Sequence, residues 1–146
     1  MKTRIIAIVL AFVSGVYAQT GSISVDQNHN NHKIIGAWIV PRVLQITSSA
    51  TPTTNTDNYD AVTITALATA ITSMTNNLSG TPNNFQKLII RFKDDGSPRA
   101  ITWGASFVSS QATLPTTTVT SKVTTVGLMW NSIKNKWVCL ATDQEP

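Results

Sequence analysis

The sequence has little charge and almost no cysteine. Only 12% of its 146 residues are charged, about half the fraction of an ordinary globular domain. Threonine, serine and asparagine take the place of the missing lysine and glutamate. The single cysteine, Cys139, excludes an intramolecular disulfide and a thiolate metal cluster. The fold must therefore be stabilised by packing, either within one chain or between chains.

A strong positive charge is also missing. The net charge is +4, and it falls to +2 when Lys2 and Arg4 near the N-terminus are set aside. Domains that bind nucleic acid usually carry a clustered basic stripe, so we expect no nucleic-acid partner. A surface rich in threonine is instead typical of β-structure that meets other proteins. Threonine suits a pleated sheet, and it costs less to bury than a charged residue does.

The first 33 residues differ from the rest of the chain. Residues 1–18 begin with positive charge, continue with an apolar run too short to span a bilayer, and end in Val16-Tyr17-Ala18. This pattern is typical of a secretory signal. A buried strand, an assembly helix and a virion anchor are the alternatives. Residues 19–33 are polar and rich in asparagine, so we expect a flexible arm there.

Periodicity predicts strands in the remaining chain. Residues 34–40 and 43–46 are apolar and β-branched, and residues 61–65 alternate in polarity. Residues 67–74 fit a short helix or an extended segment, and their interleaved threonine and serine favour the extended one. Short strands separated by turns predict an all-β domain over residues 34–146. We expect an antiparallel β-sandwich or a jelly-roll-like fold.

A first hairpin is expected over residues 85–103. Its first strand places alternate residues on opposite faces, with Leu88, Ile90 and Phe92 on one face and Lys87, Ile89, Arg91 and Lys93 on the other. Asp94-Asp95-Gly96-Ser97 supplies a tight turn, because Asp-Gly tolerates positive φ angles. Residues 99–103 are expected to return as the partner strand.

A second hairpin is expected at the C-terminal end, with strands over residues 123–130 and 136–141 around a turn at residues 131–135. Both faces of these strands are largely apolar. Strands that are apolar on both faces need cover on both sides. In so small a domain we expect a neighbouring subunit to provide the second cover.

The sequence gives little support for metal binding or for thiol chemistry. Asp26, His29 and His32 are the concentrated metal-ligand types, but they lie in the expected arm without a further ligand at a firm spacing. Cys139 lies within an apolar strand, as a core thiol does, and both histidines lie in the arm. We therefore expect no metal and no cofactor.

The carboxylate pairs also have structural explanations. Asp57 and Asp60 flank the start of a strand, and Asp94 and Asp95 build a turn. No phosphate-binding loop or hydrolase motif accompanies them. We therefore predict no catalytic residue and a protein that is not an enzyme.

Two groups of residues are candidates for contact with another molecule. The candidate surface-binding residues are Lys87, Arg91, Lys93 and Arg99. They suit contact with an acidic partner or a capsid surface. Residues of this kind also keep an exposed strand soluble. The candidate residues of an oligomer interface or of the core are Trp103, Leu128, Trp130, Trp137 and Cys139. Exposed tryptophans would also stack on sugar rings.

Several short segments between Trp38 and the C-terminus form a recognisable set. They are GAW at 36–38, PRV at 41–43, QKLIIRFKDDG at 86–96, RAITW at 99–103, LPTTTV at 114–119, MWNS at 129–132, KW at 136–137 and the stretch from Ala141 through Gln144-Glu145. Together they resemble a module of tailed-bacteriophage structural proteins that ends tail fibres or forms small head-decoration and minor virion proteins. The resemblance implies a trimeric β-sandwich that displays loops on a virion, and it implies no catalytic residues.

The expected function follows from this resemblance. It is that of a phage virion structural protein, as a capsid decoration, head fibre or tail-fibre component, that acts by self-assembly and surface display. The expected partners are the chain itself as a homotrimer, capsid or tail proteins, and a host cell-surface glycan. The alternative is a carbohydrate- or cell-surface-binding β-module, secreted or periplasmic after removal of residues 1–18. A small hydrolase is the least favoured alternative.

Overall fold

The computed structural model describes residues 40–146, so the predictions for the signal-like segment, the polar arm and the chain as far as residue 39 lie outside the described residues. Residues 40–146 form eight strands and no helix, which confirms the all-β class. The strands are β1 Val43–Ile46, β2 Thr54–Asn55, β3 Ala61–Leu67, β4 Leu78–Ser79, β5 Lys87–Asp94, β6 Phe107–Val108, β7 Val123–Asn131 and β8 Lys136–Gln144.

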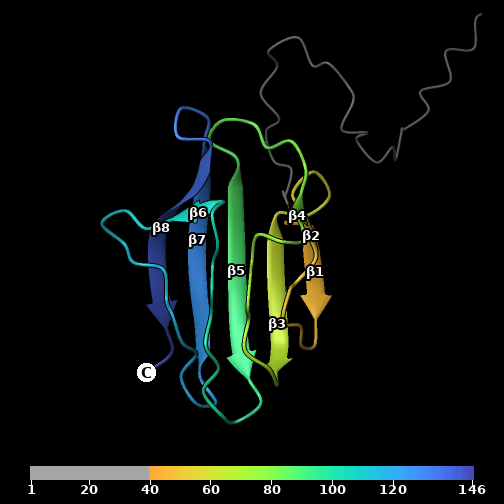
Figure 1. Cartoon of the computed structure of the whole chain (residues 1–146), viewed down its shortest axis with the longest axis vertical. Coiled ribbons are helices and arrows are strands. Elements are labelled where there is room, and N and C mark those ends of the chain that lie inside the picture. The colour runs from red at the N-terminus through yellow and green to blue at the C-terminus, as the bar shows by residue number, and fades with distance from the viewer. Residues whose placement is uncertain (1–39) are drawn as a thin grey trace, which may run out of the picture. The chain divides into compact units, whose positions relative to one another are not determined.

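Six of the strands form one mixed sheet in the order β1-β3-β5-β7-β8-β6. Figure 1 shows β1, β3, β5, β7 and β8 side by side in this order. Strands β1, β3 and β5 are parallel to one another, β5-β7 and β7-β8 are antiparallel, and β6 is parallel to β8. The prediction of an antiparallel sheet was therefore wrong for three of the five strand pairs in this sheet. Parallel neighbours require the chain to return to the same end of the sheet between strands. Here irregular segments make the return.

The returning segments stack on one another as well. Strands β2 and β4 form a small parallel sheet, and Ile71 forms a parallel bridge with Ile101. The chain from β1 to residue 103 thus winds in successive turns whose equivalent parts pair in parallel. Residues 71–74 belong to these irregular returns, so the extended alternative for residues 67–74 was the correct one.

The first predicted hairpin was wrong in its second half. Strand β5 forms as expected, but both of its edges are occupied, by β3 and by β7. Residues 99–103 therefore have no free edge of β5 to pair with. They form isolated bridges with Ile71 and with Thr117 instead, and Trp103 packs edge-on against Phe92, with ring centroids 5.7 Å apart.

The second predicted hairpin is confirmed. Asn131 of β7 pairs with Lys136 of β8, and Asn135 in the turn adopts a φ of 52°, the left-handed region that asparagine tolerates. Further along, Gly127 pairs with Ala141 and Leu128 with Cys139, which leaves Leu140 as an extra residue in a β-bulge. Beyond the bulge the alternation of β8 is reversed, because the extra residue shifts which side chains point to each face.

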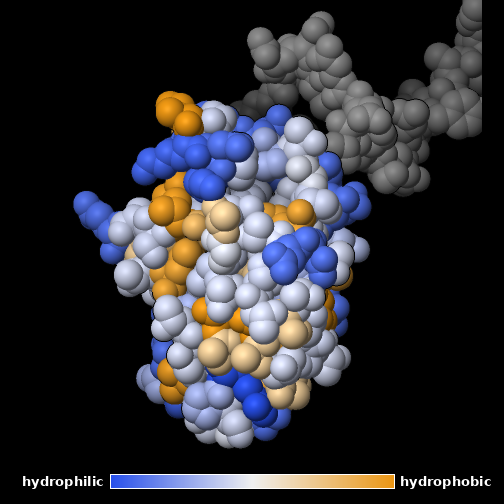
Figure 2. All heavy atoms as spheres, in the orientation of Figure 1, coloured by the Kyte–Doolittle hydropathy of each residue, from blue (hydrophilic) through white to orange (hydrophobic). Residues whose placement is uncertain are grey.

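The core lies on one face of the six-stranded sheet, which we call the inner face. Alternate residues of β3, β5 and β7 point into it, and the return segments cover it with Ile71, Met74, Ile101 and Trp103. Phe107 of β6 packs against Trp103 in the same core. In the view of Figure 2 the surface is mostly pale or blue, and apolar residues appear in small separate areas. The inner face is thus covered from within the same chain.

Candidate functional site

The opposite face of the sheet, which we call the outer face, carries the first candidate site. Strand β5 alternates strictly between exposed and buried residues, so Lys87, Ile89, Arg91 and Lys93 point outward. The register then places one small or apolar residue from each neighbouring strand beside Ile89. This apolar row consists of Val43, Ala61, Ile89, Gly127 and Ala141.

Charged residues lie next to the apolar row. The adjacent row consists of Gln45, Thr63, Arg91, Thr125 and Asp143. In the following row Lys93 pairs with Val123, and the backbone N–H of Glu145 donates to the carbonyl of Val123 at 3.0 Å. The outer face thus carries cations on β5 and anions at the C-terminal end of the chain.

The outer face is hollowed where its side chains are small. Ala61 lies between Val43 and Ile89, and a shallow depression there is lined by these residues and by Pro41 and Arg91. A second depression adjoins it, with Phe85, Lys87 and Ile89 in its wall. Ile89 is 40% exposed and Phe85 67% exposed. Apolar side chains and cations therefore alternate over one accessible surface.

An ion pair borders these depressions. The Arg42 guanidinium donates to both oxygens of Asp60, at 3.0 and 2.8 Å, and the Arg42 backbone N–H donates to Asp60 as well. The Arg42 hydrogen bonds hold the pKa of Asp60 below its usual value. Asp60 is thereby occupied in joining the starts of β1 and β3, the structural role that the sequence predicts for it.

Arg99 lies apart from the three cations of β5. Its guanidinium forms a bidentate pair with Asp95, with both contacts from Nη2 at 2.9 Å. Hydrogen bonds from Arg99 lower the pKa of Asp95. The predicted placement of Arg99 on the same strand face as Lys87, Arg91 and Lys93 was therefore wrong, because residues 99–103 do not pair with β5.

The candidate residues of the oligomer interface or core differ in their burial. Trp103, Leu128, Trp137 and Cys139 are buried in the core, while Trp130 is partly buried and packs against it. The indole N–H of Trp103 donates to the carbonyl of Pro115 at 2.7 Å. Buried side chains of this kind stabilise one copy of the chain and cannot present a ring face to a ligand.

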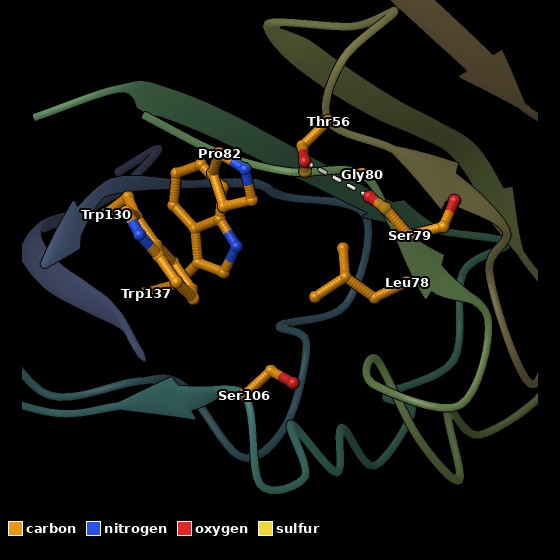
Figure 3. Close-up of a pocket in the computed structure, with 8 residues that line it drawn as sticks. All are labelled: Thr56, Leu78, Ser79, Gly80, Pro82, Ser106, Trp130 and Trp137. Atoms are coloured by element: carbon orange, nitrogen blue, oxygen red, sulfur yellow. Dashed lines mark hydrogen bonds between the residues drawn. The ribbon is translucent and has the colours of Figure 1, made fainter. Parts of the chain in front are cut away.

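A small pocket near the β7–β8 turn is the second candidate site (Figure 3). It has a volume of about 150 Å³ and is lined by Thr56, Leu78, Ser79, Gly80, Pro82, Ser106, Trp130 and Trp137. The rings of Trp130 and Trp137 meet edge to face, with centroids 5.5 Å apart. Pockets for drug-sized ligands usually exceed about 300 Å³, so this one suits no more than a small group.

Glycine is required at one wall of this pocket. Gly80 has a φ of +107°, and a Cβ atom there would lie 2.4 Å from the Thr56 hydroxyl oxygen. The Thr56 hydroxyl donates to the carbonyl of Ser79 at 3.1 Å, as Figure 3 shows. The wall of the pocket at Gly80 is therefore closely packed backbone with no room for a side chain.

Sequence reasoning did not find the rows of the outer face. The alternation of β5 identified its cations, but Gly127, Asp143 and Glu145 had no recognisable signal. Their positions depend on the pairing register and on the bulge at Leu140, which turns Asp143 to the outer face. A search for acidic residues near the C-terminus would have found both carboxylates without placing them.

Within residues 40–146 no three residues of the types that bind metal ions come together. The same residues contain no helical segment with the length and apolar character of a membrane span. Cys139 is buried, with its sulfur 3.7 Å from the carbonyl oxygen of Ala141.

Comparison of the chain with family models, with curated proteins and with solved structures found no match.

Proposed function

We propose that the chain is a structural protein of a phage virion, as a capsid decoration, head fibre or tail-fibre component, that acts by self-assembly and surface display. The observation that carries this proposal is the outer face of the sheet. An accessible β-sheet face that combines an apolar row with charged rows is suited to contact with another protein surface. The phage-like segments of the sequence support the same conclusion, and a homotrimer is the proposed assembly.

The surface chemistry agrees with a protein that meets other proteins. Thr63 and Thr125 flank Arg91 in its row, and threonine buries at lower cost than lysine or glutamate. The cations on β5 would also steer the protein toward an acidic patch of a capsid or tail protein. The proposal therefore assigns Lys87, Arg91 and Lys93 to a protein interface.

Localisation on a particle tests the proposal directly. We expect particles purified by density gradient from the source culture to contain the chain, detected by mass spectrometry, and to bind a gold-labelled antibody raised against it in electron micrographs. A cytoplasmic host protein of similar abundance serves as the negative control. Detection of the chain in the culture medium but never in the particle fraction would contradict the proposal.

A second candidate function is binding of a cell-surface glycan, in line with a secreted or periplasmic carbohydrate-binding module. The pocket of Figure 3 favours it, because the partly buried Trp130 lines one side and the hydroxyl-bearing residues Ser79 and Thr56 line the other. An aromatic ring beside hydroxyl groups is suited to a sugar ring. The small volume of the pocket limits this function to one terminal sugar.

Replacement of Trp130 tests the glycan function. Trp130→Ala is expected to lower the affinity for any glycan bound on an array by about tenfold or more, because the stacking surface is lost. Phe85→Ala removes an exposed aromatic ring that does not line the pocket. It keeps the backbone hydrogen bond from Phe85 to the carbonyl of Trp130, so it should leave the affinity unchanged. Thermal melting of both variants shows whether they fold. Binding to no glycan by the wild-type chain, or equal binding by folded Trp130→Ala, rules this function out.

A further inference from the structure

The charges of the outer face are segregated by strand. Arg91 of β5 shares a row with Asp143 of β8, and Lys93 shares the next row with Glu145. In each row one residue of β7 stands between the two charges. Figure 1 shows β5, β7 and β8 side by side in this order. In these two rows the cations thus lie on the β5 side of β7 and the anions on the β8 side.

Within residues 40–146 the cations on β5 and the anions beyond β7 do not pair with each other. Neighbouring strands are about 4.8 Å apart, so β7 separates β5 from β8 by about 9.6 Å in total. Over residues 40–146 the ion pairs are Arg42–Asp60 and Arg99–Asp95, and neither involves Arg91, Lys93 or Asp143. Arg91, Lys93 and Asp143 are therefore available to a partner with the opposite arrangement, while the carboxylate of Glu145 also accepts the backbone N–H of Val123 at 3.0 Å.

A second copy of the chain presents that opposite arrangement in one orientation. When two outer faces meet around an axis parallel to β7, the strand directions are kept, and β5 of one copy faces β8 of the next. Arg91 then lies opposite Asp143, and Lys93 opposite Glu145. An axis across the strands would instead place β5 against β5, so that cations face cations, which is unfavourable.

We propose that the outer face is the contact surface between copies of this chain, with β5 of one copy against β8 of the next and the strands running in the same direction. The inference rests on the proposed self-assembly and specifies its interface. Around a two-fold axis the two faces pack directly on each other. Around a three-fold axis the sheets are inclined to one another, and β5 of each copy adjoins β8 of the next, so the charge pairing also suits the proposed trimer. Sheets packed in this way keep their strands within about 30° of each other.

Gly127 lies at the centre of this surface. It belongs to the apolar row on β7, and it has no side chain that would hold a second sheet away. A Cβ atom at Gly127 would meet only Ala141, at 3.9 and 4.0 Å, and its φ is not in the left-handed region. A larger residue therefore fits the single copy, while it would obstruct a facing sheet.

A larger residue at position 127 should therefore prevent assembly without unfolding the single copy, which gives the first test. In sedimentation velocity experiments on the full chain over a range of concentrations, we expect the wild type to sediment as a dimer or trimer. Gly127→Gln should sediment as a monomer while its far-ultraviolet circular dichroism and melting temperature stay those of a folded protein. Ile133→Gln, at a 94% exposed position in the β7–β8 turn, should assemble like the wild type. A monomeric wild type, or normal assembly of folded Gly127→Gln, would overturn the inference.

Charge reversal gives the second test, which does not depend on Gly127. Arg91→Asp and Asp143→Arg are each expected to weaken assembly by about tenfold or more, because each places like charges opposite one another. The double variant should recover most of the wild-type assembly. Lys134→Asp changes the net charge by the same amount as Arg91→Asp, from an exposed turn, and should have no effect.

The outcomes separate this interface from the proposed function. Weakening by both single variants without recovery in the double variant would show that the two residues do not face each other. Equal weakening by Lys134→Asp would assign the effect to net charge. A chain that assembles as described but is absent from particles would leave the interface standing and overturn the virion function. A chain that is present in particles but monomeric in solution would overturn the interface and leave the virion function standing.

Discussion

Trp103→Ala is expected to lower the free energy of unfolding by about 4 kcal/mol, because large-to-small changes of a buried aromatic residue cost about 3–5 kcal/mol. Trp103 packs against Phe92 of the sheet and against Phe107, with centroid distances of 5.7 and 5.2 Å. It also donates its indole N–H to Pro115. One side chain thus joins the sheet to the segments that cover its inner face. Chemical denaturation followed by circular dichroism measures the change.

A conservative replacement separates the two contributions of Trp103. Trp103→Phe keeps much of the aromatic packing but leaves the Pro115 carbonyl without its donor, so we expect a loss of about 1–3 kcal/mol. Val119→Ala, at a 40% exposed position, serves as a control and should cost less than about 0.5 kcal/mol. A loss for Trp103→Ala no larger than that for Val119→Ala would contradict the assignment of Trp103 to the core.

Asp94→Ala is expected to lower the free energy of unfolding by about 3 kcal/mol at neutral pH, because it deprives two backbone donors of their acceptor. Asp94 is 3% exposed, and its Oδ1 accepts the N–H of Gly96 at 2.9 Å and of Ser121 at 2.8 Å. The carboxylate thus connects the end of β5 to the residues just before β7. Asp94→Asn retains an acceptor oxygen and should cost less than Asp94→Ala.

The same carboxylate makes stability depend on pH. Burial acts to raise the pKa of Asp94, but the N–H groups of Ser121 and Gly96 and the charge of Arg99 together hold this pKa below its ordinary value. The folded state therefore binds the proton more weakly than the unfolded state does. The stability that the carboxylate supplies is present above the unfolded pKa of about 3.9. It is lost as the pH falls through the lower pKa of the folded state.

Denaturation curves between neutral pH and acid test this linkage. We expect the wild type to lose stability steadily below about pH 4, and Asp94→Asn to lose less over the same range. Some dependence should remain in the variant, because the pKa values of Asp60 and Asp95 are also lowered. Parallel curves for Asp94→Asn and the wild type would show that Asp94 does not contribute to the acid sensitivity.

Local signals were sufficient for some elements and not for others. The hairpin of β7 and β8 was predictable, because two apolar strands flank a short turn that contains asparagine. Strand β5 was predictable from its alternation alone. The partner of β5 was not, because a turn sequence such as Asp94-Asp95-Gly96 shows that the chain bends without showing whether the edge beside β5 is still free. Parallel pairing with β3, from a distant part of the chain, was also invisible.

The residues of the candidate site were also only partly predictable from local signals. The cations Lys87, Arg91 and Lys93 were identified from the period of one strand, while Arg99 was misplaced together with its strand. The anion Asp143 was not found at all. Alternation counted from Trp137 and Cys139 places residue 143 on the inner face, and only the bulge at Leu140 reverses it. A bulge depends on how two strands fit side by side, which no single strand encodes.

The sequence by itself determined the all-β class, the faces of β5 and the C-terminal hairpin. These properties depend on composition and on short-range periodicity, which neighbouring residues set through backbone geometry. The tertiary structure alone decided the mixed strand order, the path of residues 99–103 and the rows that bring Arg91, Gly127 and Asp143 onto one surface. These depend on register and on competition for strand edges. Hydrogen bonds between distant segments set both, and they are fixed only when the whole sheet assembles.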